Sequence, residues 1–176
     1  MAGKYVDGGD KAGLIPVDHN GVVSWVKSGI LESEMFHSER AAEIIGRQKP
    51  IDKAIIKRVE KSLAGKGVTI HQSEDANKWL ISKGAEAVTF SDGMIIMHTD
   101  VSASGFFEEL IHYGQIKNGR AIAGDMENNI LMEIEAKERL ITHRKAYGLT
   151  DYEVEALTEG LSHYKMELEI LRKAGD

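Results

Sequence analysis

The chain has 176 residues, of which 42% are hydrophobic and 28% are charged, and its formal net charge is −6. This length and composition are typical of one globular domain. The acidic balance argues against nucleic-acid binding, because domains that grip phosphate backbones are usually basic. The sequence contains no cysteine, which excludes disulfides, thiolate-bound metal and cysteine catalysis. No apolar run approaches the ~20 residues that span a bilayer, so we expect no membrane partner.

Residues 1–50 are expected to form a flexible N-terminal arm with partly ordered segments. Residues 1–13 hold four glycines and no apolar periodicity, which is typical of disorder. Short strands are expected at residues 14–17 and 22–26, and a helix at residues 34–45. None of these segments carries a motif that points to a particular chemistry.

Residues 51–176 have stronger signals and are expected to form the functional domain. An Asp92-Gly93 pair marks a hairpin turn, and Thr150 with Glu153 forms a capping box. The expected elements are, in chain order, a helix at 53–64, a strand at 68–71, a helix at 74–83, strands at 85–91 and 94–98, a helix from Ser102 or Ser104 to 117, and long helices at 125–147 and 151–171. This order predicts an α+β fold, in which a small mixed sheet with a hairpin packs on one helix and two long helices follow.

The helix at residues 105–115 carries the densest set of reactive side chains. Glu108, His112 and Gln115 fall at i, i+4 and i+7, so they share one helical face, and Glu109 follows Glu108. The spacing is that of the zinc-binding motif H-E-x-x-H with Glu108 in place of the first histidine. Because glutamate oxygen and histidine nitrogen bind zinc at similar distances, Glu108 and His112 are candidate ligands. Glu109 is the candidate general base, and the extra carboxylate would also suit manganese or iron.

A site of this type needs a third ligand, and the next helix offers Glu133, Glu135 and Glu138. A helical wheel places Glu138 within the apolar face, while Glu133 and Glu135 flank that face. His98, the last residue of a predicted strand, is a candidate substrate contact or a structural histidine. The residues alone therefore leave the third ligand open.

The motif is also compatible with two arrangements that contain no zinc-type site. Acids in the first turns of a helix are stabilised by the helix dipole, by about 0.3–1 kcal/mol each, and His112 would then be a packed core residue. Glu109 and His112 also have the E-x-x-H spacing of di-iron bundles, which require a second copy. Glu159 and His163 are four residues apart, so they do not supply that copy.

From about residue 51 to 171 the chain resembles C-terminal toxin domains of bacterial polymorphic toxins and prophage-encoded proteins. The resemblance is carried by F-E-E-L-I-H-Y-G-Q at 107–115, E-I-E-A at 133–136 with L-I at 140–141, and K-A-Y-G-L at 145–149. The arrangement is also similar to compact gluzincin-type metallopeptidases, in which E-x-E-A follows H-E-x-x-H. This resemblance implies a zincin-like fold and favours Glu135 as the third ligand.

The resemblance implies a peptidase-like, metal-dependent hydrolase that acts as a toxin or effector on a protein or peptide target. It further implies zinc or another divalent metal, a cognate immunity protein as partner, and delivery into a cytoplasm as part of a secreted protein. An extended substrate would pair with the strand at 94–98, near His98 and Gln115.

Two alternatives stay open at this point. One is a metal-free toxin or binding domain on the same scaffold, in which the adjacent acids Glu108 and Glu109 give one carboxyl a raised pKa. The other is a structural or interaction module of a phage particle or a secretion assembly.

Overall fold

The computed structural model describes residues 14–19, 22–27, 36–37, 45 and 47–175. Near the N-terminus, β1 (Leu14–His19) and β2 (Val22–Lys27) form an antiparallel hairpin, which confirms the two strands expected there. The expectation for residues 1–13 lies outside the described residues.

The helix expected at residues 34–45 is wrong near its start. Phe36 and His37 instead form β3 (Phe36–His37), which pairs with a strand of the main sheet, and most of the remaining range lies outside the described residues. A two-residue strand carries no periodicity, so the sequence pattern could not reveal it.

The main sheet has the strand order β3-β5-β6-β4, with β4 (Thr69–His71), β5 (Ala87–Thr89) and β6 (Met94–Met97). The β5–β6 hairpin is antiparallel, as the Asp92-Gly93 turn predicted, and β6 runs parallel to β4. All residues of β5 and β6 are buried. Strands buried on both faces are continuous apolar runs, and this explains the absence of polar alternation in β6.

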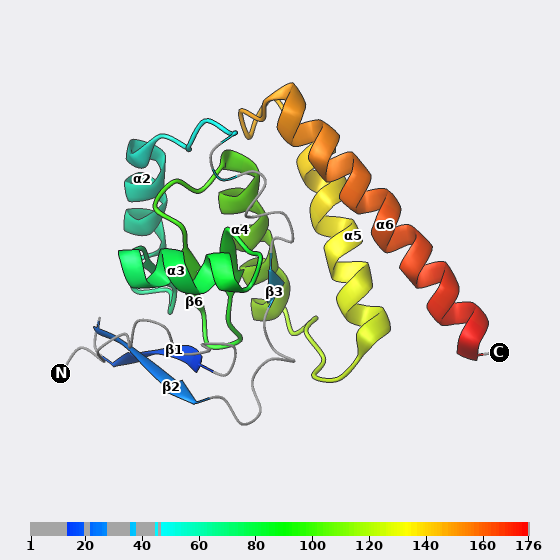
Figure 1. Ribbon diagram of the computed structural model, residues 1–176, viewed down its shortest axis with the longest axis horizontal. Helices are drawn as coiled ribbons and strands as arrows, with labels where there is room; N and C mark the ends of the chain where they lie inside the picture. Colours follow the sequence, from blue (N-terminus) through cyan, green and yellow to red (C-terminus); the bar gives the residue numbers. More distant parts are fainter. Residues whose placement is uncertain (1–13, 20–21, 28–35, 38–44, 46, 176) are drawn as a thin grey trace.

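Helices cover both faces of this sheet (Figure 1). On one face, Val88 and Ile96 pack in a common core with Trp79 and Leu80 of α3 (Glu74–Ser82). The other face carries a second core, whose buried members are Ile51, Ile56, Ala87, Ile95, Met97, Val101 and Phe106. These residues come from α2 (Lys53–Leu63), the sheet, α4 (Ala103–Lys117) and the segments that precede the two helices. The expected helix 103–117 is therefore confirmed, with Ser102 as its N-cap.

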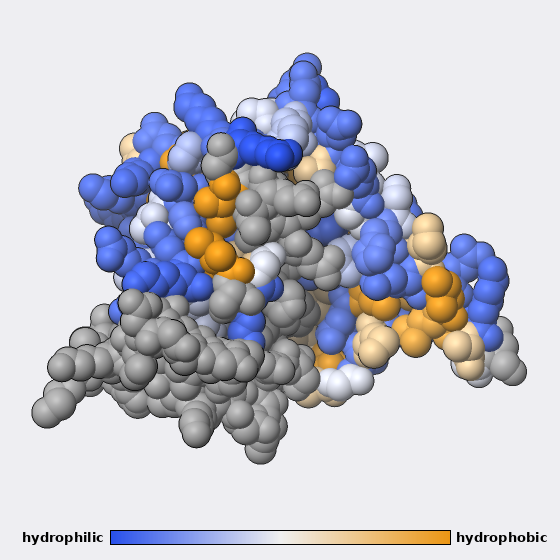
Figure 2. Space-filling model, in the orientation of Figure 1, coloured by the Kyte–Doolittle hydropathy of each residue, from blue (hydrophilic) through white to orange (hydrophobic). Residues whose placement is uncertain are grey.

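Two long helices complete the chain. α5 (Met126–Thr142) packs against both α4 and the antiparallel α6 (Asp151–Gly175), and the α5–α6 pair extends away from the sheet (Figure 1). α5 ends before the expected residue 147, because residues 143–148 form turns that end at Gly148 with φ of 66°. Hydrophobic side chains gather over the far end of the pair (Figure 2), where Met126, Met166 and Ile170 are exposed.

The architecture confirms the expected α+β class, with a small mixed sheet followed by two long helices. Within the described part of the chain, no helix has the length and apolarity that crossing a bilayer requires.

Candidate metal centre

A buried polar cluster fixes the start of α4. Its members are Glu86, Ser102, Ser104 and Glu153, and we call it the capping cluster. One carboxylate oxygen of Glu86 accepts hydrogen bonds from the backbone N–H of Ser102 at 2.7 Å and from its hydroxyl at 2.6 Å. Glu153 accepts from the backbone N–H of Ser104 at 2.9 Å. Burial raises the pKa of Glu86 to about 7, although the two bonds from Ser102 lower it.

Gly105 allows this close packing. A Cβ atom added at Gly105 would lie 2.4 Å from the carboxylate of Glu86, well inside van der Waals contact. The glycine therefore brings the first turn of α4 against the residue that precedes β5, and this fixes the helix relative to the sheet.

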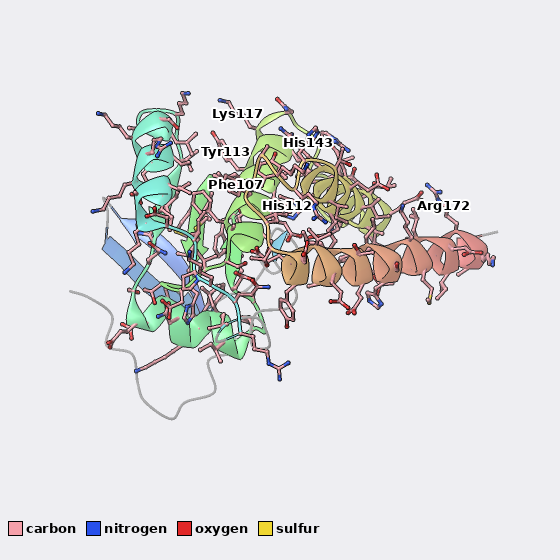
Figure 3. All side chains as sticks on the ribbon, turned by 90° about the horizontal axis from the view of Figure 1, so that it is seen from above. Phe107, His112, Tyr113, Lys117, His143 and Arg172 are labelled. Carbon is pink, nitrogen blue, oxygen red and sulfur yellow. The ribbon has the colours of Figure 1, made fainter. Side chains whose placement is uncertain are left out.

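One turn further on, a second buried cluster joins α4 to α5. It consists of Glu108 and His112 on α4 and Glu133 and Lys137 on α5, and we call it the charge cluster. These residues are 2%, 0%, 7% and 5% exposed, respectively. Glu108, His112 and Glu133 each offer one possible ligand atom, and the three atoms lie within 4.8 Å of one another. His112 lies between α4 and α5 in the view from above (Figure 3).

Gln115 fixes the orientation and tautomer of the His112 ring. The amide nitrogen of Gln115 donates to the carbonyl of Met132 at 3.0 Å, so its amide oxygen faces His112. Nδ1 of His112 lies 2.9 Å from that oxygen and must donate to it. Nε2 is then the nitrogen directed at Glu133, as in metal-binding histidines whose second nitrogen is held by an outer hydrogen bond.

A positive charge must sit between Nε2 of His112 and the Glu133 carboxylate. Without one, two lone pairs would face each other across the 3.4 Å that separates these atoms. A proton or a metal ion can supply the charge. Charge-assisted hydrogen bonds are usually about 2.7–2.9 Å long. Two ligands of a tetrahedral zinc ion, each about 2.0–2.1 Å from the metal, are about 3.4 Å apart, so the spacing is compatible with a metal as well as with a long ion pair.

Lys137 supplies a competing cation. Its ammonium lies 2.5 Å from Glu108 and 3.3 Å from Glu133. Burial disfavours charge on Lys137, but the two carboxylates outweigh it and raise its pKa. In the same way, the carboxylates overcome burial and raise the pKa of His112 to about 9, while His112 and Lys137 overcome burial and lower the pKa of Glu133 to about 2. Without metal, the cluster is thus neutralised by two protonated cations.

Glu109 lies beside this cluster and is fully buried. Thr89 of β5 donates to its Oε2 at 2.6 Å, whereas Oε1 has no hydrogen-bond partner among the described residues. Burial raises the pKa of Glu109 to about 8, against the opposing effects of His112 and Thr89. This carboxyl can therefore exchange a proton near neutral pH.

The residues of the charge cluster fit a divalent cation on one condition. A Glu/His/Glu donor set is chemically suitable for zinc, manganese or iron. The Nε2 of His112 is oriented for it, and the unsatisfied Oε1 of Glu109 is a further polar atom buried nearby. The condition is that the Lys137 ammonium gives up its contacts with Glu108 and Glu133, because the ammonium and the metal would compete for the same oxygens.

Several residues expected at the site lie elsewhere. The structure joins Glu133 to His112, whereas Glu135, which the resemblance favoured, pairs with Arg120. Glu138, which the helical wheel favoured, is exposed and pairs with Lys165 at 2.7 Å.

Two expectations about substrate contacts are also affected. β6 is an inner strand between β5 and β4, so it offers no free edge to an extended substrate along its paired residues. His98 accepts a hydrogen bond from the Asp100 backbone at its Nδ1 and has a structural role in that turn. Gln115 lies next to His112 and acts on that ring.

Sequence reasoning missed Lys137 and Thr89. Glu133 and Lys137 are spaced i, i+4, a pairing that a helical wheel could have suggested, although such pairs are usually on the surface. Thr89 comes from a different element, and only the fold brings it to Glu109. Comparisons of the chain with protein-family models, with curated proteins and with solved structures gave no match.

Proposed function

We propose that the chain is a metal-dependent hydrolase of the peptidase-like type, with Glu108, His112 and Glu133 as metal ligands. The observation that carries the proposal is the orientation of His112. Gln115 directs its Nε2 at a carboxylate 3.4 Å away, a spacing and a donor set that suit a tetrahedral cation. A divalent ion at this position supplies Lewis-acid chemistry to a substrate carbonyl when bound.

In this proposal Glu109 is the proton acceptor. Thr89 holds its Oε2, so Oε1 is the oxygen that takes the proton from the attacking water and returns it to the leaving group. A pKa of about 8 makes this carboxyl a more effective base than an ordinary glutamate once it is deprotonated. Gln115 serves as the positioning residue for His112.

The zincin-like scaffold and the toxin role are further parts of the proposal. They are supported by the segment order, in which a hairpin leads into the motif helix and a glutamate-bearing helix follows. They are also supported by the resemblance of 107–115, 133–136 and 145–149 to toxin domains. On this basis we expect a protein or peptide target inside a bacterial cytoplasm and a cognate immunity protein that blocks the site.

The contacts of Lys137 support a second candidate, a metal-free toxin or binding domain. The ammonium bridges Glu108 and Glu133, so the buried charges are already compensated. The pKa of Glu109 is raised, as this alternative expected, but burial is the main cause and the adjacent Glu108 adds only a smaller effect. Here the charge cluster would shape a surface for a partner, and it would have no role in hydrolysis.

Two readouts on the same variants separate the candidates. Protein loaded with zinc or manganese should hydrolyse unfolded casein or a peptide pool, and Glu109→Gln should lower the rate at least about 100-fold. Glu138→Gln, which changes a surface acid on α5, should leave the rate unchanged. Expression in a bacterial cytoplasm should arrest growth for the wild type but not for Glu109→Gln. Growth arrest that depends on Glu109 in protein that binds no metal would favour the metal-free candidate.

A further inference from the structure

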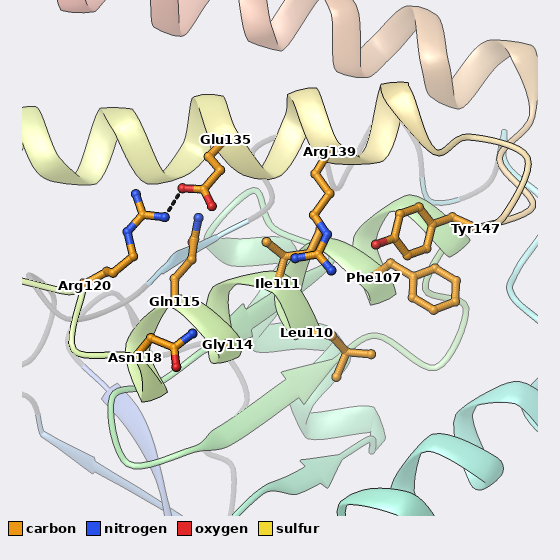
Figure 4. Close-up of a pocket in the computed structure, with 10 residues that line it drawn as sticks. All are labelled: Phe107, Leu110, Ile111, Gly114, Gln115, Asn118, Arg120, Glu135, Arg139 and Tyr147. Carbon is orange, nitrogen blue, oxygen red and sulfur yellow. Dashed lines mark hydrogen bonds and ion pairs between the residues drawn. The ribbon is translucent and has the colours of Figure 1, made fainter.

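A cavity of about 380 Å³ lies between α4 and α5 (Figure 4), and Gln115, which holds His112, is among the residues that line it. Phe107, Ile111 and Gly114 line it, and each directly precedes a residue that belongs to or holds the charge cluster. Cavity and cluster therefore occupy neighbouring faces of α4, about 100° apart. The volume is within the range of about 300–1,000 Å³ that is usual for small-molecule sites.

One side of the cavity is aromatic and aliphatic. The rings of Phe107 and Tyr147 pack with centroids 4.8 Å apart, and Leu110 and Ile111 continue the wall. Gly114 leaves room at its base, because a Cβ atom added there would meet nothing within 4 Å. This side suits a ligand with an apolar body of about the size of one amino-acid side chain.

The other side carries the charges. Arg120 forms an ion pair with Glu135, so these two charges compensate each other. Arg139 extends toward the cavity between Ile111 and the aromatic pair (Figure 4). Among the ion pairs of the described residues, none includes Arg139. Its guanidinium is therefore available to an anion, and the planar fork of arginine matches a carboxylate.

We propose that this cavity is a binding site for a carboxylate carried on an aromatic or branched aliphatic body, such as the C-terminal residue of a peptide. The carboxylate would bind Arg139, and the apolar body would lie along α4 against Ile111 and over Gly114. The proposal does not depend on metal binding or on hydrolysis at the charge cluster.

The test uses N-acetyl-L-phenylalanine as the probe, titrated into the full chain and followed by isothermal calorimetry or by NMR shifts. Its neutral amide has the same body without the charge. We expect the acid to bind at least about tenfold more tightly than the amide, because the amide cannot form the charged hydrogen bonds. Arg139→Gln should abolish that difference. Arg172→Gln, at the far end of α6, should preserve it.

Gly114→Leu provides a second variant that fills the cavity and keeps every charge. It should weaken binding of both the acid and the amide at least about tenfold. Equal binding of acid and amide, or undiminished binding to Gly114→Leu, would overturn the proposal. Phenyl phosphate is the comparison anion, and tighter binding of phenyl phosphate than of the carboxylate would also overturn it, because the site would then be one for phosphate.

Discussion

The two buried polar clusters of α4 differ in how they are stabilised. In the capping cluster, carboxylates accept hydrogen bonds of 2.6–3.1 Å from backbone N–H groups and hydroxyls, and Oε2 of Glu86 has no partner among the described residues. In the charge cluster, carboxylates face cations, and one separation, between His112 and Glu133, is 3.4 Å. Their nearest members on α4, Ser104 and Glu108, lie about one helical turn apart.

Under the proposed function, the difference separates a structural role from a functional one. The capping cluster joins the start of α4 to β5 and α6 with short, directed bonds, as expected of a network that fixes a fold. The charge cluster places four ionisable groups in the buried contact between α4 and α5, where hydrophobic residues of similar volume would often be at least as stable. Such an arrangement is typical of sites that are retained for binding or chemistry.

The largest effect is expected from Lys137→Met. This variant leaves Glu108 buried without its cation and Glu133 with His112 alone, which should lower the free energy of unfolding by about 3–5 kcal/mol. Added zinc should restore much of that loss, because a metal then replaces the ammonium between the carboxylates. Urea denaturation with and without zinc measures both. Lys165→Met, which removes an exposed ammonium, is the matched control, and destabilisation that zinc leaves unchanged would weaken the metal assignment.

The capping cluster should respond to Glu153→Ala without any metal dependence. Glu153 accepts from the backbone N–H groups of Ser104 and Thr150, and both would lose their partner. We expect a loss of about 2–4 kcal/mol in the free energy of unfolding. Glu155→Ala, which removes an exposed acid on the same helix, should change it by less than about 0.5 kcal/mol. If zinc restored the free energy of unfolding of Glu153→Ala, the separation between a structural capping cluster and a metal-binding charge cluster would be contradicted.

The pH dependence of stability should distinguish Glu109 from its neighbours. Burial raises its pKa from 4.5 to about 8, so its protonated form is favoured in the folded state. Its contribution to the free energy of unfolding is complete below pH 4.5 and is lost as the pH rises through 8. Between about pH 5 and 9, the free energy of unfolding of the chelator-treated wild type should fall by at least about 2 kcal/mol more than that of Glu109→Gln. Parallel unfolding curves for the two proteins would contradict the raised pKa, and Glu138→Gln should follow the wild type.

Two glycines of α4 provide the smallest and most closely matched comparison. Gly105→Ala pushes a Cβ atom into the Glu86 carboxylate and should destabilise the chain by about 1–3 kcal/mol. Gly114→Ala meets open space and should stabilise it by about 0.5–1 kcal/mol through helix propensity. Thermal unfolding of both variants measures the difference. A Gly105→Ala variant at least as stable as the wild type would show that Gly105 does not hold the capping cluster in contact.

Local signals were enough to predict the elements around the site. The Asp92-Gly93 turn indicated the hairpin, and the Thr150–Glu153 capping box indicated a helix start, both confirmed. A serine cap was expected at Ser102 or Ser104, and the structure has it at Ser102. Each is determined by residues a few positions apart. The spacing of the motif likewise indicated the shared face of Glu108, His112 and Gln115.

The partners across helices were not predictable in the same way. α5 is buried by both α4 and α6, so its apolar wheel does not show which flank meets α4, and Glu133 could not be separated from Glu138. Lys137 has the charge of a surface residue, and only the placement of α5 brings it inside. The strand at Phe36–His37 depends on pairing with β5, about 50 residues later in the chain.

The most direct test of the central claim is metal binding by the purified protein. Calorimetric titration of chelator-treated protein with zinc, checked by elemental analysis, should give one ion per chain. His112→Ala and Glu133→Gln should abolish binding, whereas Glu135→Gln, on a different face of the same helix, should bind as the wild type does. Zinc binding that survives Glu133→Gln but is lost in Glu135→Gln, or no binding by the wild type, would contradict the assignment of the charge cluster as a metal centre.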